Sequence, residues 1–227
     1  MKRATQDEQM DAADIDPAEY ARVLTDLAKV NWWTMATRPT LTFLDRAVAD
    51  RRRFTLLDVG FGDGDMLRAI ARWAAKRGIE ADLIGVDLNP RSEDVARAAT
   101  PADMPIRYIT GDYRDHLGDV DLIVSSLVTH HMDDAERIDF LQTMERAARR
   151  GWFVNDIRRH WFPYLGFPIL ARLMGWHRIV REDGTLSIAR GFVAREWRAM
   201  IDAAGLDPAA VSILPFFPFR LCVARLR

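Results

Sequence analysis

The sequence predicts an α/β fold in which a parallel β-sheet carries helices on both faces. Two observations support this prediction: short apolar runs alternate with longer amphipathic segments, and a glycine-rich loop follows the first of those runs. Alternating strands and helices are typical of parallel sheets, because each crossover helix packs back on one face of the sheet. A length of 227 residues suits one such domain.

The composition is that of an ordinary globular protein. Hydrophobic residues make up 49% and charged residues 29% of the chain, which excludes disorder as its main state. The net charge of -1 makes a nucleic-acid partner unexpected. The single Cys222 excludes an internal disulfide framework and a cysteine-based zinc cluster.

The sequence contains no apolar run of about 18 residues, so we expect no membrane span. The N-terminus has basic residues but no apolar stretch behind them, so it does not resemble a secretory signal. A cytoplasmic location is therefore the expectation.

Residues 1–53 are expected to form an N-terminal helical cap, and residues 54–227 a Rossmann-like domain. The first 16 residues are acidic and expected to fray. Asp16 followed by Pro17 predicts a helix start, with an N-cap and a proline in the first turn. A second helix is predicted over 39–49.

The first strand and helix of the sheet domain are the most clearly marked. Residues 54–59 form a short apolar run that ends in glycines, as expected for a strand buried on both faces. Residues 66–77 place Met66 and Ile70 at helical spacing, and Gly78 ends that helix.

The remaining elements continue the alternation. Further strands are predicted over 81–87, 106–110, 121–125, 151–156, 211–214 and 219–226. Further helices are predicted over 90–99, 134–149 and 195–204. The segment up to Trp176, interrupted by prolines, is left without an assigned element.

The loop after the first strand has the pattern G-x-G-x-G, formed by Gly60, Gly62 and Gly64. Such a strand–loop–helix unit is a nucleotide-type site at the carboxyl end of a sheet. A dinucleotide fingerprint requires glycine where Asp65 stands. Asp63 and Asp65 also disfavour a pyrophosphate, so the loop favours a cationic ligand.

Acidic residues also end the next two strands. Asp87 can accept both hydroxyls of a ribose, or alternatively cap the following helix, a role for which Asn89 competes. Asp112 can bond an adenine amino group while the ring of Tyr113 packs against the base. The alternative for Asp112 is an ordinary turn residue.

Together these residues resemble the class I S-adenosylmethionine-dependent methyltransferases that act on small molecules. The resemblance rests on Asp58-Val59-Gly60-Phe61-Gly62-Asp63-Gly64, Gly85-Val86-Asp87, Gly111-Asp112 and residues 121–126. It implies a doubly wound seven-stranded sheet with an antiparallel last strand. Two departures are Asp63, where Thr or Ser is common, and the absence of the usual double glycine in the fifth strand.

The resemblance also implies where S-adenosylmethionine binds. The three loop glycines would flank its methionine moiety, Asp87 its ribose and Asp112 its adenine. Arg38 is a candidate partner for the cofactor carboxylate. The full predicted cofactor site consists of Asp58, Gly60, Phe61, Gly62, Gly64, Asp87, Leu88, Asp112, Tyr113, Ser125, Ser126 and Arg38.

Three histidines are candidate catalytic residues. Methyl transfer from a sulfonium requires alignment, and an oxygen nucleophile also benefits from a base. His130 is the first candidate for a general base or substrate contact, and His160 is the second. His131 matches a position that is often structural in similar enzymes. No metal site is expected, because acids and histidines show no helix-borne ligand spacing.

The apolar segment within residues 158–192 is interpreted as a substrate-capping insertion, as in similar enzymes. Its alternatives are ordinary core or a homodimer contact. An apolar lid favours a hydrophobic phenolic or polyketide-like metabolite as substrate, as in secondary metabolism. We expect O-methylation, in preference to methylation of carbon or nitrogen. A nicotinamide-dependent reductase and a non-catalytic cofactor-binding module are the alternatives. The predicted substrate-binding residues are Trp32, Trp33, Arg158, Phe162 and Tyr164.

Overall fold

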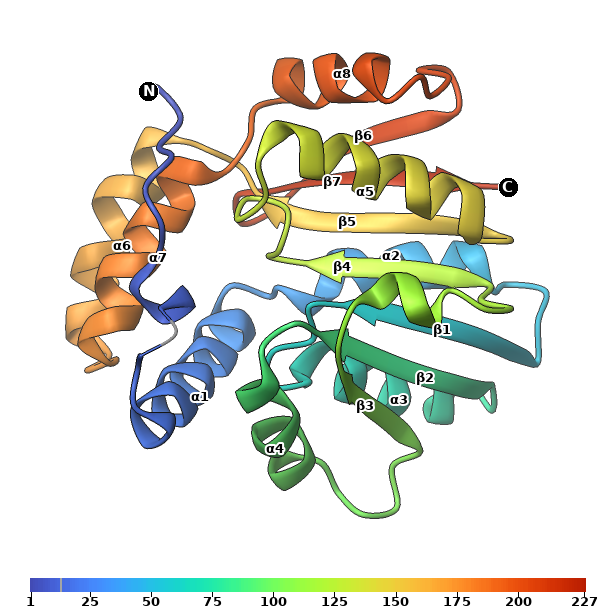
Figure 1. Ribbon diagram of the computed structural model, residues 1–227, viewed down its shortest axis with the longest axis horizontal. Helices are drawn as coiled ribbons and strands as arrows, with labels where there is room; N and C mark the ends of the chain where they lie inside the picture. Colours follow the sequence, from blue (N-terminus) through green and yellow to red (C-terminus); the bar gives the residue numbers. More distant parts are fainter. Residues whose placement is uncertain (13) are drawn as a thin grey trace.

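The computed structural model describes residues 1–12 and 14–227, and these form a seven-stranded sheet of order β3-β2-β1-β4-β5-β7-β6 (Figure 1). Neighbours among the first five strands are parallel, whereas β7 is antiparallel to both β5 and β6. This confirms the predicted fold class. The strands are β1 (Arg53–Val59), β2 (Glu80–Asp87), β3 (Ile106–Thr110), β4 (Leu122–Ser126), β5 (Gly151–Ile157), β6 (Val211–Phe216) and β7 (Arg220–Leu226).

The helices largely follow the predicted spans. Asp16 caps the first of them, accepting hydrogen bonds from the backbone N–H groups of Ala18 and Glu19 at 2.9 and 3.0 Å. The helices are α1 (Pro17–Trp33), α2 (Thr37–Ala47), α3 (Asp65–Lys76), α4 (Pro90–Ala99), α5 (Asp134–Ala147), α6 (Trp161–Leu173), α7 (Arg178–Arg190) and α8 (Ala194–Ala203), with the 3-10 turns η1 (Gln9–Asp11) and η2 (Tyr113–His116).

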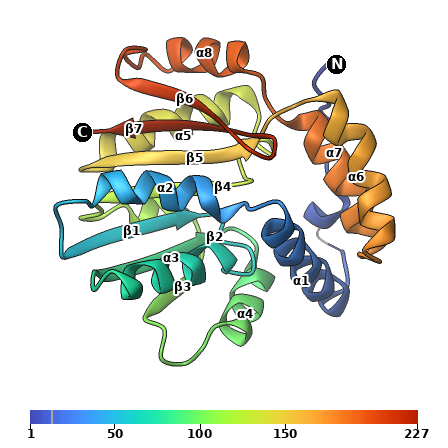
Figure 2. The same cartoon turned by 180° about the vertical axis from the view of Figure 1, so that it is seen from behind.

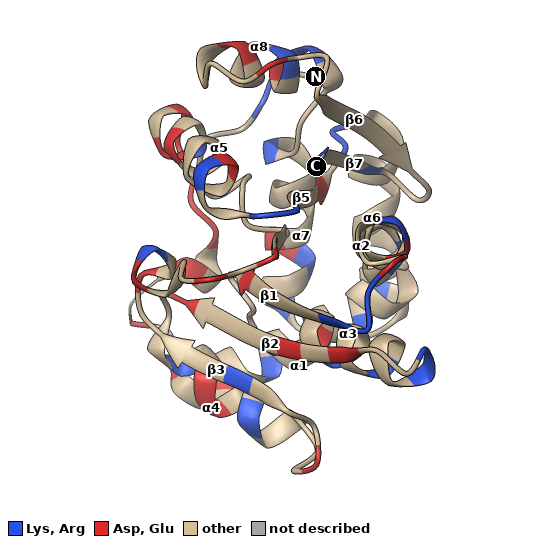
Figure 3. Cartoon of the chain, turned by 90° about the vertical axis from the view of Figure 1, so that its right-hand side faces the viewer, with Lys and Arg blue, Asp and Glu red and all other residues tan. Residues whose placement is uncertain are grey.

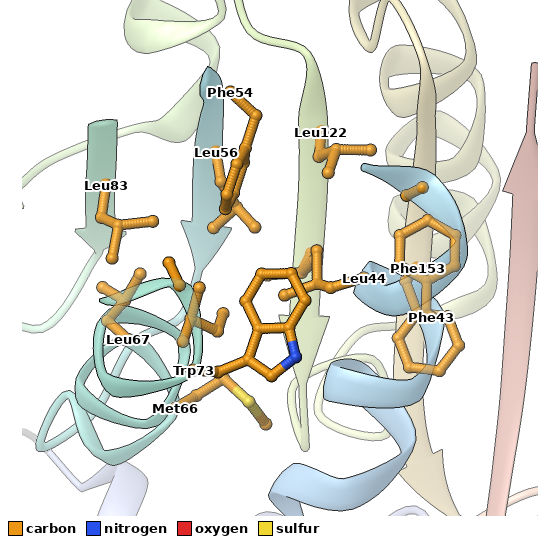
Figure 4. Close-up of a cluster of buried hydrophobic side chains, with 14 of the residues drawn as sticks. Phe43, Leu44, Phe54, Leu56, Met66, Leu67, Trp73, Leu83, Leu122 and Phe153 are labelled. Atoms are coloured by element: carbon orange, nitrogen blue, oxygen red, sulfur yellow. The ribbon is translucent and has the colours of Figure 1, made fainter. Parts of the chain in front are cut away.

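Alternate side chains of each strand enter two separate cores. Leu56 of β1 belongs to the core under α2 and α3, whereas its neighbour Leu57 belongs to the core under α5 and α8. Figure 4 shows the first core, where Phe43 of α2 stacks on Phe153 of β5 with ring centroids 4.9 Å apart. Burial on both faces explains why the strands read as continuous apolar runs.

A third apolar cluster lies beyond the carboxyl ends of the strands. It joins Val23 of α1 to Ala171 of α6 and Val180 of α7. Figures 1 and 2 both show α1, α6 and α7 grouped at this end of the sheet. Local sequence patterns predicted neither α6 nor α7. Within α6, Pro163, Gly166 and Pro168 interrupt the helical pattern.

The structure differs from two expectations about the N-terminal region. The first residues pack against the rest of the chain: Glu8 is buried, and the backbone N–H groups of Gln9 and Met10 donate to Asp183 of α7 at 3.1 and 2.9 Å. In addition, α2 packs on the sheet and on α3 rather than in a cap. Long-range partners that the local sequence does not reveal hold both segments.

Acidic and basic residues are interspersed along the elements visible in Figure 3, as the net charge of -1 suggests. Among the described residues, none of the helices has the length and apolarity that crossing a membrane requires.

Candidate active site

A cavity of about 830 Å³ opens at the carboxyl ends of the parallel strands. Val59, Asp87, Ser126 and Ile157, the last residues of β1, β2, β4 and β5, line its floor. Helices α1, α6 and α7 and the N-terminal segment supply its other walls. A volume of this order accommodates a nucleoside-sized ligand together with a second small molecule.

The glycine loop borders this cavity in a backbone conformation that favours glycine. Gly60, Gly62 and Gly64 have φ values of 77°, 55° and 79°. A Cβ atom at Gly62 would find only Leu24 Cδ2 within contact range, at 3.9 Å. The backbone at Gly62 is therefore accessible to a ligand at close range.

Asp87 connects this loop to the end of β2. Its Oδ2 accepts a hydrogen bond from the Gly62 N–H at 2.9 Å, and its Oδ1 accepts one from the Asn89 N–H at 2.8 Å. Asn89, not Asp87, caps α4, because its side chain accepts from the Arg91 N–H at 3.1 Å. Asp87 therefore remains a cavity residue, and burial raises the pKa of its carboxyl group.

Two further carboxyl groups make the base of the loop strongly acidic. Asp58 is buried, and its Oδ1 has no hydrogen-bond partner among the described residues. Burial and the charges of Asp65 and Asp87 raise the pKa of Asp58 to about 8. Asp65 accepts from Asn31 Nδ2 at 2.9 Å, and burial with the nearby Asp63 raises its pKa to about 6. This arrangement suits a cationic ligand, which would relieve the repulsion.

Arg220, at the start of β7, brings an opposite charge to the same cavity. It is 5% exposed; its Nη2 donates to Thr34 Oγ1 at 3.2 Å, and its Nη1 has no partner among the described residues. Burial lowers the pKa of this guanidinium group. The sequence analysis did not single out Arg220, because only the antiparallel pairing of β7 with β5 brings it to the cavity.

Most of the predicted cofactor residues meet at the cavity, and four do not. Asp112 caps η2 and pairs with Arg114 at 3.1 Å, and Ser125 is buried and donates to the Val59 carbonyl at 3.0 Å. Gly64 and the exposed Arg38 also lie outside the lining. The predicted residues that line the cavity are Asp58, Gly60, Phe61, Gly62, Asp87, Leu88, Tyr113 and Ser126.

None of the predicted substrate residues lines the cavity. Trp32 and Trp33 are 74% and 52% exposed, and Phe162 of α6 is 57% exposed. Arg158 is exposed, and Tyr164 also lies outside the lining. Other side chains of the same segments enter instead: Asn31 and Thr34 from the end of α1, and Pro163 and Phe167 from α6. Helix periodicity could have found Pro163 and Phe167 had the α6 span been recognised as a helix.

Two of the three candidate catalytic histidines line the cavity, and the third lies outside it. His160 caps α6 by accepting from the Phe162 N–H at 3.1 Å, stacks on Phe219, and lies outside the cavity lining. His130 and His131 both line the cavity, with ring centroids 4.3 Å apart. Their loop is held by Arg190, which donates to the carbonyl oxygens of His130 and His131 at 3.0 and 3.2 Å.

A carboxylate lies beside the Nδ1 atom of each ring. His130 Nδ1 lies 2.7 Å from Asp156 Oδ1, and His131 Nδ1 lies 2.8 Å from Asp11 Oδ2. Burial opposes the charged form of His130, but the charge and hydrogen bond of Asp156, together with Glu8, raise its pKa to about 9. In turn, the charge and hydrogen bond of His130 lower the pKa of Asp156 to about 2, although burial by itself would raise it.

Comparisons with known proteins agree with this fold. Residues 56–151 match a family model described as "Methyltransferase domain". A search of the curated proteins gave no match for this sequence. The matched residues run from β1 through β4 and include the glycine loop, and the fold is the one expected from the resemblance to class I S-adenosylmethionine-dependent methyltransferases.

Solved structures resemble the chain at low sequence identity. Human N-acetylserotonin methyltransferase in complex with SAM is 17% identical with a TM-score of 0.63, and the match covers 93% of this chain and 56% of that one. Magnesium protoporphyrin IX methyltransferase from Synechocystis PCC 6803 with bound SAH is 13% identical, with a TM-score of 0.56 and coverages of 96% and 91%. A putative O-methyltransferase from Nostoc punctiforme is 18% identical, with a TM-score of 0.59 and coverages of 90% and 60%. The chain thus spans just over half the length of the human enzyme.

Proposed function

We propose that this chain binds S-adenosylmethionine and transfers its methyl group to an oxygen atom of a hydrophobic phenolic or polyketide-like small molecule. The observation that carries the proposal concerns two buried atoms at one cavity, a carboxyl oxygen of Asp58 and a guanidinium nitrogen of Arg220. Neither has a hydrogen-bond partner among the described residues. A ligand with an ammonium and a carboxylate would satisfy both groups at once.

Different cavity residues bind different groups of the cofactor. Asp58 and Asp65 face its ammonium group, Arg220 its carboxylate, and Asp87 its ribose hydroxyls, while Tyr113 packs on the adenine side. When bound, the cofactor supplies an electrophilic methyl group on a positively charged sulfur. Arg220, rather than Arg38, is therefore the proposed partner of the cofactor carboxylate.

The remaining part of the cavity receives the acceptor. Met10, Met132, Phe167 and Ile188 give it apolar walls, which favour a hydrophobic molecule and exclude water. The polar groups at this end include His130 and His131. A positive charge at this end of the cavity stabilises the deprotonated oxygen of the acceptor. The pKa of the acceptor hydroxyl is thereby lowered.

In the reaction, the acceptor oxygen forms the new C–O bond as the C–S bond breaks, and the hydroxyl proton passes to solvent. The chain contributes alignment of the two reactants and a dry, charged environment.

Calorimetry with S-adenosylmethionine and with NADH tests the cofactor assignment. We expect binding of the first at one site and no heat from the second; NADH binding without S-adenosylmethionine binding would overturn the proposal. A panel of phenolic and polyketide-like compounds, incubated with an isotopically labelled methyl donor and read by mass spectrometry, tests the acceptor class. Label on carbon or nitrogen alone would contradict O-methylation.

The oligomeric state is a separate proposal. Several large apolar side chains of α1 and α6 are exposed, among them Trp32, Trp161, Leu165 and Leu173. We propose that they form a homodimer contact, and light scattering after size exclusion checks this. A monomer at all concentrations would exclude it.

A further inference from the structure

We infer that Glu8, His130 and His131 together bind a divalent transition-metal ion at the acceptor end of the cavity. All three residues line the cavity, and they come from two distant segments of the chain. The proposed binding of the ion depends only on the positions of these three residues. Only the role of the ion in the reaction rests on the proposed function.

The spacing of the ligand atoms on these three residues fits a shared ion better than mutual hydrogen bonds. His130 Nε2 lies 3.6 Å from Glu8 Oε1, and His131 Nε2 lies 3.8 Å from Glu8 Oε2. These separations exceed the roughly 2.7–3.2 Å of an N–H···O hydrogen bond. Ligands about 2.1 Å from a tetrahedral ion are roughly 3.4 Å apart, so small movements would complete the site.

The other nitrogen of each ring is already oriented. Asp156 faces Nδ1 of His130 at 2.7 Å, and Asp11 faces Nδ1 of His131 at 2.8 Å. A carboxylate that accepts the Nδ1 proton fixes the tautomer and leaves the Nε2 lone pair for an ion, as in most histidine metal sites. Ser187 orients Glu8 in the same way, donating to Oε1 at 2.7 Å.

The charge of this cluster also suits a divalent cation. Glu8, Asp11 and Asp156 contribute three negative charges, and Arg190, on the carbonyl oxygens of the histidine loop, contributes one positive charge. When an ion takes the place of any proton on Nε2, both imidazole rings are neutral and these groups leave two negative charges. A set of two imidazole nitrogens and one carboxylate favours ions such as Zn²⁺, Co²⁺ or Fe²⁺ over Mg²⁺ or Ca²⁺.

Three protein ligands leave coordination positions open, and all three residues line the cavity. An acceptor hydroxyl bound there would lose its proton to solvent more readily, because the ion stabilises the oxyanion. The ion would supply the positive charge that the proposed reaction requires at this end of the cavity.

Co²⁺ added to chelator-treated protein tests the site directly, since Co²⁺ held by histidine and carboxylate gives visible absorption bands. We expect one equivalent to bind. Glu8→Gln and His131→Ala each remove a ligand and should weaken binding more than about tenfold. Asp11→Asn, which changes only the partner of His131, should weaken it by about 10–100-fold.

His116→Ala is the matched control, because His116 lies in η2 outside the cavity and its loss should leave Co²⁺ binding unchanged. Absence of the bands, or bands that persist in both Glu8→Gln and His131→Ala, would overturn the inference. Thermal denaturation shows whether each variant is folded, and Asp11→Asn keeps all three ligands in place.

Calorimetry with S-adenosylmethionine on the same metal-free protein separates the two proposals. Cofactor binding without Co²⁺ binding removes only the metal site. Co²⁺ binding without cofactor binding supports the metal site and removes only the proposed methyl transfer.

Discussion

The carboxyl group of Asp87 accepts a hydrogen bond from the backbone N–H of Gly62 at 2.9 Å. This bond ties the glycine loop after β1 to the end of β2. The same carboxyl group lines the cavity, so it both shapes the loop and is accessible to a ligand there.

Replacing Asp87 by Ala should therefore weaken S-adenosylmethionine binding by about 1–3 kcal/mol, the scale of a lost charged hydrogen bond. Isothermal calorimetry measures this directly. Asp82→Ala is the control: Asp82 lies at the far end of the same strand, where it pairs with Arg107 at the surface. Equal affinity in wild type and Asp87→Ala would remove Asp87 from the site.

Asp58→Asn should stabilise the folded chain and weaken cofactor binding. The pKa of Asp58 is raised to about 8, so between about pH 4 and 8 the folded state holds a proton that the unfolded state has released. This group's contribution to stability is therefore present below pH 4 and is lost as pH rises through 8. We expect the melting temperature of Asp58→Asn to exceed that of wild type at pH 8, by about 2–4 °C for each kcal/mol gained.

The difference in melting temperature between Asp58→Asn and wild type should decrease toward pH 4, where the wild-type carboxyl group is protonated in both the folded and the unfolded state. A melting-temperature difference that does not vary with pH would contradict the raised pKa. Asp121, whose pKa is lowered by its Thr55 and Arg149 partners despite partial burial, gives the comparison: Asp121→Asn should be destabilised at pH 8.

Arg220→Met should lower the affinity for S-adenosylmethionine by at least about tenfold, because hydrogen bonds between charged groups contribute about 1.5–3 kcal/mol. Methionine keeps most of the side-chain length and removes a buried charge that lacks a carboxylate partner among the described residues, so the variant should fold. Arg38→Met is the matched control and should bind the cofactor normally. The reverse pattern would restore Arg38 as the carboxylate partner.

Gly64→Ala should destabilise the chain by about 1–3 kcal/mol, as measured by urea denaturation. Gly64 has a φ of 79°, and a Cβ atom there would collide with the Tyr108 ring. Gly118→Ala is the control, since a Cβ atom at Gly118 meets no heavy atom within 4 Å. Similar stabilities for the two variants would show that the loop adapts without strain.

His130→Ala should reduce turnover by about 10²-fold or more while leaving cofactor affinity intact, because in the proposed reaction His130 lines the cavity beside the acceptor and supplies charge that stabilises its oxyanion. His160→Ala should change turnover by less than about twofold, because His160 caps α6 outside the cavity. Steady-state kinetics on an accepted substrate compares them. Equal losses in both variants would reinstate His160 as a catalytic candidate.

The sequence alone predicted the sheet and one half of the site. Apolar runs alternating with amphipathic segments indicated the strands and helices, and the residues at the ends of β1 and β2 indicated a ligand site. This works because the carboxyl ends of neighbouring parallel strands meet at one edge of the sheet. Asp58, Gly62 and Asp87 therefore came together as local patterns predicted.

Only the tertiary structure decided the other half. Asp11 and His131 are 120 positions apart, and they meet because the N-terminal segment packs along α7. Arg220 reaches the cavity through the antiparallel pairing of β7, whereas Arg38, a reasonable candidate by position, points to solvent. Local patterns encode which face of a strand or helix is buried, but long-range packing determines which distant side chains share a cavity.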